Sequence, residues 1–198
     1  MHGRLIKFIE AAWGFSLLEE YELSAPDEEV VPLHAHTYFN VSESGEFCQY
    51  LIYDYYDPEG YYASLEADPD EYAREMNRLW DNMQGFLDEE KNEVNGEPVH
   101  PEVVFIDLGF RGREELPFVT WVITFRGNLV SGLNTYVTWS EEEELDYDCE
   151  AIWVFPEGAE IVDVRTLMEY EVHANILSLW ARERDIIGGY EEIIFRIP

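Results

Sequence analysis

The sequence predicts an α+β protein that is mostly antiparallel β, with one main amphipathic helix at about residues 70–92 and a β-sandwich-like C-terminal half. Two patterns predict this fold. Apolar residues recur at helical spacing over residues 70–92, and short strand-like runs separated by glycine-containing turns follow from residue 103 onwards. The 198 residues suffice for one large domain or two small ones. We expect an α+β part at 1–96 and a β-rich part at 97–198, packed together as one compact unit.

The first expected elements are an ambiguous segment and a hairpin. Residues 5–21 fit a helix, but a strand also fits them. Residues 33–42 and 47–56 are two strand-like runs on either side of a Ser44-Gly45 turn, and this arrangement predicts a β-hairpin.

The expected helix has start and stop signals in the sequence. Asp68 is placed as an N-cap, Pro69 as the first helical residue, and Glu71 completes a capping box. Asn95-Gly96 follows as a stop signal. The apolar stripe, which we expect to face a core, consists of Tyr72, Met76, Leu79, Trp80, Met83, Phe86 and Leu87.

The C-terminal half is predicted to be a series of short strands, which indicates an antiparallel sandwich or open barrel. Residues 166–180 fit both a strand and a helix, and their content of Val, Tyr and Ile favours a strand. The other expected strands lie at 103–110, 117–125, 135–139, 150–155, 161–164 and 193–197.

The charge balance excludes several classes of protein. The chain has 43 Asp and Glu against 12 Lys and Arg, a formal net charge of −31. Direct binding of nucleic acid on a broad basic face needs clustered Lys and Arg residues, and docking on anionic lipid needs them too. Neither is therefore expected. No window approaches about 18 apolar residues, and the N-terminus is too short and too charged for a signal peptide. We therefore expect a soluble, cytoplasmic protein.

The acid excess has two explanations, and one segment favours the more specific of them. A surface adapted to high salt or tuned for solubility would be acidic, and so would a surface that binds a basic partner or mimics the phosphates of a nucleic acid. Residues 141–150 contain no Lys or Arg. Acids flanked by aromatic rings suit Arg- and Lys-rich partners. The predicted partner-binding residues are Glu141, Glu142, Glu143, Glu144, Asp146, Asp148, Trp139 and Tyr147.

Two histidines provide the alternative hypothesis. In a strand, His34 and His36 point to the same face, so both imidazoles could bind one divalent metal such as zinc. Carboxylates that could complete such a site are Glu43, Glu46 and Asp54. The alternative is therefore a small metal-dependent enzyme or metal-binding domain.

The sequence nominates no catalytic residues, because none of the usual nucleophile, phosphate-loop or dinucleotide motifs is present. The two cysteines, Cys48 and Cys149, form no C-x-x-C pair and are expected to be reduced thiols. The favoured function is therefore a non-enzymatic, acidic interaction or regulatory protein that engages a basic protein partner without a cofactor, with nucleic-acid mimicry as one form of that function.

Overall fold

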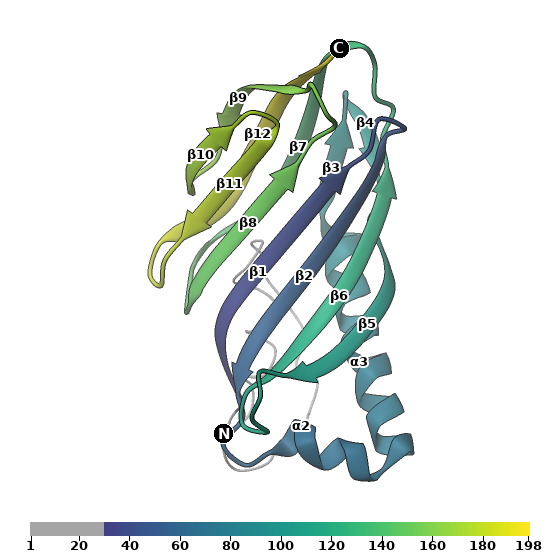
Figure 1. Ribbon diagram of the computed structural model, residues 1–198, viewed down its shortest axis with the longest axis vertical. Helices are drawn as coiled ribbons and strands as arrows, with labels where there is room; N and C mark the ends of the chain where they lie inside the picture. Colours follow the sequence, from purple (N-terminus) through teal and green to yellow (C-terminus); the bar gives the residue numbers. More distant parts are fainter. Residues whose placement is uncertain (1–29) are drawn as a thin grey trace.

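The computed structural model describes residues 30–198, and in it the strands form two sheets that face each other, with the main helix beside them (Figure 1). The fold is mostly antiparallel β with a sandwich-like part, as the sequence predicts. Each sheet contains strands from both 1–96 and 97–198. The ambiguous segment 5–21 and the N-terminus lie outside the described residues. Among residues 30–198, no helix is long and apolar enough to cross a membrane.

The larger sheet has seven strands in the order β10-β11-β8-β1-β2-β6-β5. All its neighbours are antiparallel except β1 and β8, which run parallel. Its strands are β1 (Val31–Val41), β2 (Glu46–Tyr56), β5 (Glu102–Phe110), β6 (Pro117–Arg126), β8 (Asp148–Val154), β10 (Glu169–His173) and β11 (Ile176–Ala181).

The smaller sheet has five strands in the order β4-β3-β7-β12-β9, all antiparallel. Its inner face packs against the inner face of the larger sheet around the buried rings of Phe39, Trp153 and Phe195. Its strands are β3 (Lys91–Val94), β4 (Glu97–Val99), β7 (Gly132–Glu144), β9 (Glu160–Arg165) and β12 (Ile186–Ile197).

The predicted hairpin is confirmed as β1 and β2. Its turn requires glycine, because Gly45 has a φ of 79° and a Cβ there would lie 2.1 Å from the carbonyl oxygen of Gly127. Residues 166–180 also resolve as the favoured strand structure. They form the β10–β11 hairpin, whose turn places Ala174 at a φ of 54°.

The predicted helix is confirmed as α3 (Pro69–Glu89), which begins where the sequence indicates. The Asp68 side chain accepts hydrogen bonds from the backbone N–H groups of Asp70 and Glu71, at 3.0 and 3.3 Å. The end is earlier than the expected residue 92. Glu90 is extended, with a ψ of 147°, because the next residues pair with β7 as strand β3.

The stop signal of the expected helix has a different role in the structure. Asn95-Gly96 makes the tight turn between β3 and β4, with φ angles of 54° and 76°. Two short helices precede α3 and were not predicted: α2 (Tyr61–Ser64) and the 3₁₀ helix η1 (Leu65–Ala67).

The apolar stripe of α3 faces a core, as expected. It covers the inner face of the seven-stranded sheet around Trp121, whose indole N–H donates to the Leu79 carbonyl oxygen at 3.3 Å. Trp80 lies at the margin of this contact and is partly exposed. Met76, Leu79, Met83, Phe86 and Leu87 are the buried members of the stripe.

Candidate functional site

The outer face of the seven-stranded sheet carries both predicted histidines. Because β1 pairs with β2 and β8, His34 lies level with Asp54 and Asp148, and His36 lies level with Glu150. The two imidazole rings have centroids 5.8 Å apart. The two histidines therefore lie on the same face of the sheet, as the sequence predicts.

His36 is the more enclosed of the two histidines. Its ring stacks on Tyr38 at a centroid distance of 4.3 Å, and its Nε2 lies 3.8 Å from a carboxylate oxygen of Glu150. Burial lowers the pKa of His36, and the Glu150 carboxylate partly opposes that effect. His36 is therefore a mostly neutral ring at neutral pH.

The metal-site hypothesis needs further ligands. Among residues 30–198, no group of three or more His, Cys, Asp or Glu side chains is arranged to hold a metal ion. Asp54, a candidate third ligand in the sequence, instead accepts a hydrogen bond of 2.8 Å from Nε of Arg111. Glu43 lies in the turn between β1 and β2. Glu46 lies at the end of β2 next to this turn, whereas His34 lies level with Asp54 near the other end of β2.

The Arg111 contact shows how this face holds a guanidinium group. Nε of Arg111 lies 2.8 Å from the Asp54 carboxylate, and its guanidinium carbon lies 4.1 Å from the centroid of the Phe118 ring. A carboxylate and an aromatic face together provide charge and cation–π attraction for one arginine.

The centre of the same face is aromatic and open. Tyr38 and Tyr50 lie opposite each other on β1 and β2 and are 40% and 46% exposed. Half-buried aliphatic side chains flank them at the same level, Ile152 on β8 and Val122 on β6. We call this surface the outer face, and it consists of His34, His36, Tyr38, Tyr50, Ile52, Asp54, Phe118, Val122, Asp148, Glu150 and Ile152.

The predicted acid cluster is not one continuous loop. Residues 141–144 form the end of strand β7, where Glu143 and Glu144 pair with β12. Glu141, Glu142, Glu144 and Asp146 are exposed, whereas one carboxylate oxygen of Glu143 is buried. Asp148 is exposed and begins β8, which connects the cluster to the outer face.

The two aromatic residues predicted beside the acids lie on different sides of the protein. Tyr147 is only 4% exposed and contacts Tyr53 in the core, with ring centroids 6.0 Å apart. Trp139 is partly exposed on the five-stranded sheet, where the Lys91 ammonium lies 4.3 Å from its ring centroid. Of the predicted acids, the structure places Asp148 on the face that carries Tyr38 and Tyr50, whereas Trp139 lies on β7 with Glu141–Glu144 and Tyr147 lies in the core.

A polar row inside the sandwich was missed by the sequence reasoning. On the inner face of the five-stranded sheet, Asn92, Thr138 and Glu191 lie side by side on β3, β7 and β12. Tyr136 donates from its hydroxyl to the Asn92 carbonyl oxygen at 2.7 Å, and the Asn92 amide donates to Glu90 at 2.7 Å. The alternation of side chains along a strand could have indicated this row, because residues two positions apart point to the same face. Each residue of the row lies two positions from an apolar residue that points inward.

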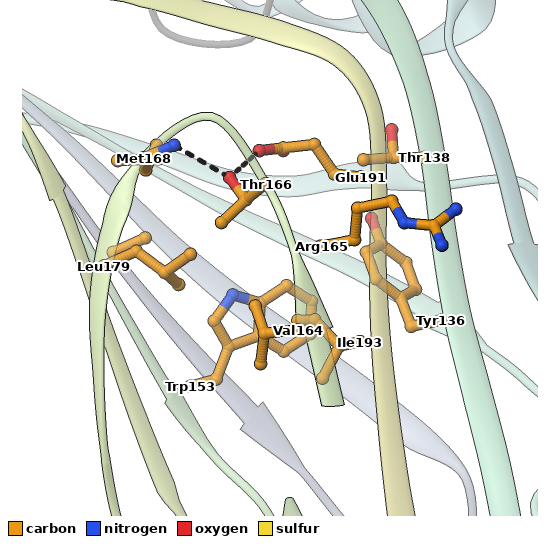
Figure 2. Close-up of a pocket in the computed structure, with 11 residues that line it drawn as sticks. Tyr136, Thr138, Trp153, Val164, Arg165, Thr166, Met168, Leu179, Glu191 and Ile193 are labelled. Carbon is orange, nitrogen blue, oxygen red and sulfur yellow. Dashed lines mark hydrogen bonds between the residues drawn. The ribbon is translucent and has the colours of Figure 1, made fainter. Parts of the chain in front are cut away.

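Two small cavities flank this row, each about 20 Å³ and both lined by Tyr136 and Thr138. Figure 2 shows the first, in which the Thr166 hydroxyl bonds the Glu191 carboxylate above the Trp153 ring. Burial raises the pKa of Glu191. Burial also raises the pKa of Glu90, in the second cavity, to about 7.

No protein-family model matches this chain, and no curated protein matches its sequence. The arrangement of its own side chains is therefore the basis for a functional proposal.

Proposed function

We propose that the protein is a non-enzymatic interaction or regulatory protein that binds an arginine-bearing basic surface of a partner protein through the outer face. The observation that carries this proposal is the Arg111 contact, in which one guanidinium is held by Asp54 and Phe118. The chain thus contains an internal example of the chemistry that it would offer to a partner.

The remaining outer face also carries aromatic rings and a carboxylate on neighbouring strands. Tyr38 pairs with Ile152 on the neighbouring strand β8. The Tyr38 ring stacks on His36, and the half-exposed Glu150 carboxylate lies 3.8 Å from His36. Aromatic residues at the centre and charged residues at the margin are typical of protein–protein interfaces. Arginine fits this arrangement better than lysine, because its planar group can stack on a ring and bond a carboxylate together.

Electrostatic attraction would bring the partner to this face. Glu144 ends strand β7, and Asp146 follows it in the connection that leads to Asp148 at the margin of the outer face. A field of one sign raises association rates, and salt screens it over about 8 Å at physiological ionic strength. A narrower form of the proposal is nucleic-acid mimicry, in which the partner surface is one that otherwise binds phosphates.

A defined peptide tests the proposal without a known partner. The probe is a fluorescent peptide of alternating Arg and Ser, and its affinity is measured by anisotropy at several salt concentrations. One variant combines Tyr38→Ser with Tyr50→Ser, and a second combines Asp148→Asn with Glu150→Gln. Each should weaken binding by about 5–30-fold at low salt, because two exposed cation–π or charge contacts contribute about 0.5–1 kcal/mol each.

The control removes the same charge elsewhere. Asp81→Asn with Glu89→Gln neutralises two exposed carboxylates on α3 and leaves the outer face intact. This control should weaken binding only about two-fold, through the smaller net charge alone. Equal losses in the control and in the Asp148/Glu150 variant would show that net charge, and not the outer face, attracts the peptide. A lysine peptide that binds as tightly as the arginine peptide would also contradict the proposal.

A further inference from the structure

A row of apolar side chains crosses the outer face and continues to the edge strand β5. The strand register places Phe105 of β5 level with Val122 of β6, which in turn is level with Tyr50 of β2. Tyr50 is level with Tyr38 of β1, and Tyr38 is level with Ile152 of β8. These strands lie side by side in the sheet (Figure 1). We call this row the apolar belt, and it consists of Phe105, Val122, Tyr50, Tyr38 and Ile152.

The apolar belt is open to solvent, and none of its members is charged. Phe105, Tyr50 and Tyr38 are 51%, 46% and 40% exposed, and the side chains of Val122 and Ile152 are partly exposed. Soluble proteins rarely expose a continuous apolar surface, and one that is rimmed by polar residues marks an interaction site. The apolar belt therefore indicates a contact with a second molecule that extends across five neighbouring strands.

Acidic side chains lie mainly on one side of the apolar belt. Two residues away on the same face, this side carries Asp107 on β5 and Glu150 on β8, both exposed, and Asp148 follows at the start of β8. The next level on the opposite side holds one acid on these five strands, Glu102 on β5. The other four strands there carry uncharged residues, which are Thr124, Cys48, Asn40 and Val154. A segment that covers the belt would therefore meet acids mainly along one of its flanks.

The central strands under the belt have no free backbone groups to offer a partner. Each of β6, β2, β1 and β8 already has a neighbouring strand on both sides. An extended segment laid on top of these strands would bury its own N–H and C=O groups against apolar side chains without partners. A helix satisfies these groups within itself. Its apolar side chains also recur about every 5.4 Å along the axis, which is close to the spacing of about 4.8 Å between strands.

We propose that the apolar belt binds an amphipathic helix of the partner protein, with arginine residues along the flank that faces Asp107 and Glu150. This inference rests on the proposed function, because it assigns a structure to the arginine-bearing segment that the outer face would bind. Five strands span about 19 Å, which is the length of a helix of about 13 residues. The chain contains a related contact, because the apolar stripe of α3 covers the inner face of the same sheet. A net charge of −31 opposes the alternative that a second copy of the chain covers the belt.

Three peptides of identical composition test the shape of the ligand. Each contains the same numbers of Leu, Arg and Gln residues, ordered at helical period, at the alternating period of a strand, or in a scrambled order. Their affinities for the full chain are measured by fluorescence anisotropy at one salt concentration. The helical-period peptide should bind about ten-fold more tightly than the other two, because only this order gives one apolar stripe without unpaired backbone groups. Equal affinities of the three peptides would overturn the inference.

Two substitutions in the apolar belt show where the helical-period peptide binds. Phe105→Ser should weaken its binding by about ten-fold and Val122→Thr by about three-fold, because both reduce the apolar area that binding removes from water. The Arg–Ser peptide depends on the rings of Tyr38 and Tyr50, so its affinity should change less than about two-fold in both variants. The control is Leu133→Ser, which removes a 55% exposed apolar side chain from β7 in the other sheet and should leave both affinities unchanged.

The outcomes separate this inference from the proposed function. If the Arg–Ser peptide binds the outer face and the order of residues in the other three peptides has no effect, the helix is wrong and the proposed function stands. If neither the Arg–Ser peptide nor the helical-period peptide binds, both fail. Sedimentation of the free protein tests the remaining occupant. A dimer that becomes a monomer in Phe105→Ser would overturn the inference, because a second copy would then cover the apolar belt.

Discussion

The substitution Glu90→Gln tests how far an interior charge destabilises the fold. Burial raises the pKa of Glu90 from 4.5 to about 7, and the Glu191 carboxylate adds to this shift while the Asn92 amide opposes it. The folded protein therefore keeps a proton on Glu90 at pH values where the unfolded chain has released it. The contribution of Glu90 to stability is fully present below its unfolded pKa and is lost as pH rises towards about 7.

The size of the effect follows from the same pKa values. One pKa unit corresponds to about 1.4 kcal/mol, so the rise from 4.5 to about 7 corresponds to about 3 kcal/mol. Gln has the shape of Glu and can still accept the hydrogen bond of the Asn92 amide, but it carries no charge. The free energy of unfolding of Glu90→Gln should therefore exceed that of the wild type by about 3 kcal/mol at about pH 8. At about pH 4 the two free energies should be equal.

Urea unfolding across this pH range, at one constant ionic strength, measures the difference. The control is Glu89→Gln, which shares the change in net charge but is exposed, so its stability relative to the wild type should vary little with pH. If Glu90→Gln differs from the wild type by the same amount at every pH, Glu90 titrates as in the unfolded chain and the reasoning is refuted.

Two further predictions concern the core beside α3. Trp121→Ala should cost about 3–5 kcal/mol of unfolding free energy, whereas Trp80→Ala should cost about 2 kcal/mol, because Trp121 is fully buried and water can fill the space left by the partly exposed Trp80. Equal losses in urea unfolding would show that both rings are enclosed alike. Arg78→Ala should cost about 3–5 kcal/mol, because it leaves the buried Glu75 carboxylate without its ion pair. Adding Glu75→Leu to Arg78→Ala should restore part of that loss, and no recovery in the double variant would contradict this account.

Local elements could be predicted because their signals are local. The start of α3 depends on Asp68 and Pro69, which act within one turn of helix. The β1–β2 hairpin depends on a turn glycine between two runs suited to pair with each other. The pairing of His34 and His36 on one face follows from strand geometry alone.

Long-range contacts could not be predicted in the same way. The parallel pairing of β1 with β8 joins residues more than a hundred positions apart, and it is this pairing that sets Glu150 beside His36. The end of α3 was misplaced for the same reason, because residues from Lys91 onwards pair with a strand about 45 positions later.

The sequence by itself determined the periods, the turns and the net charge of this protein, because each of these depends on neighbouring residues or on composition. The tertiary structure alone decided which acids face water. Glu90 and Glu191 resemble the many surface glutamates in sequence, yet both line interior cavities. Strand parity shows which residues share a face, but only the packing of the second sheet and α3 determines that the face is enclosed.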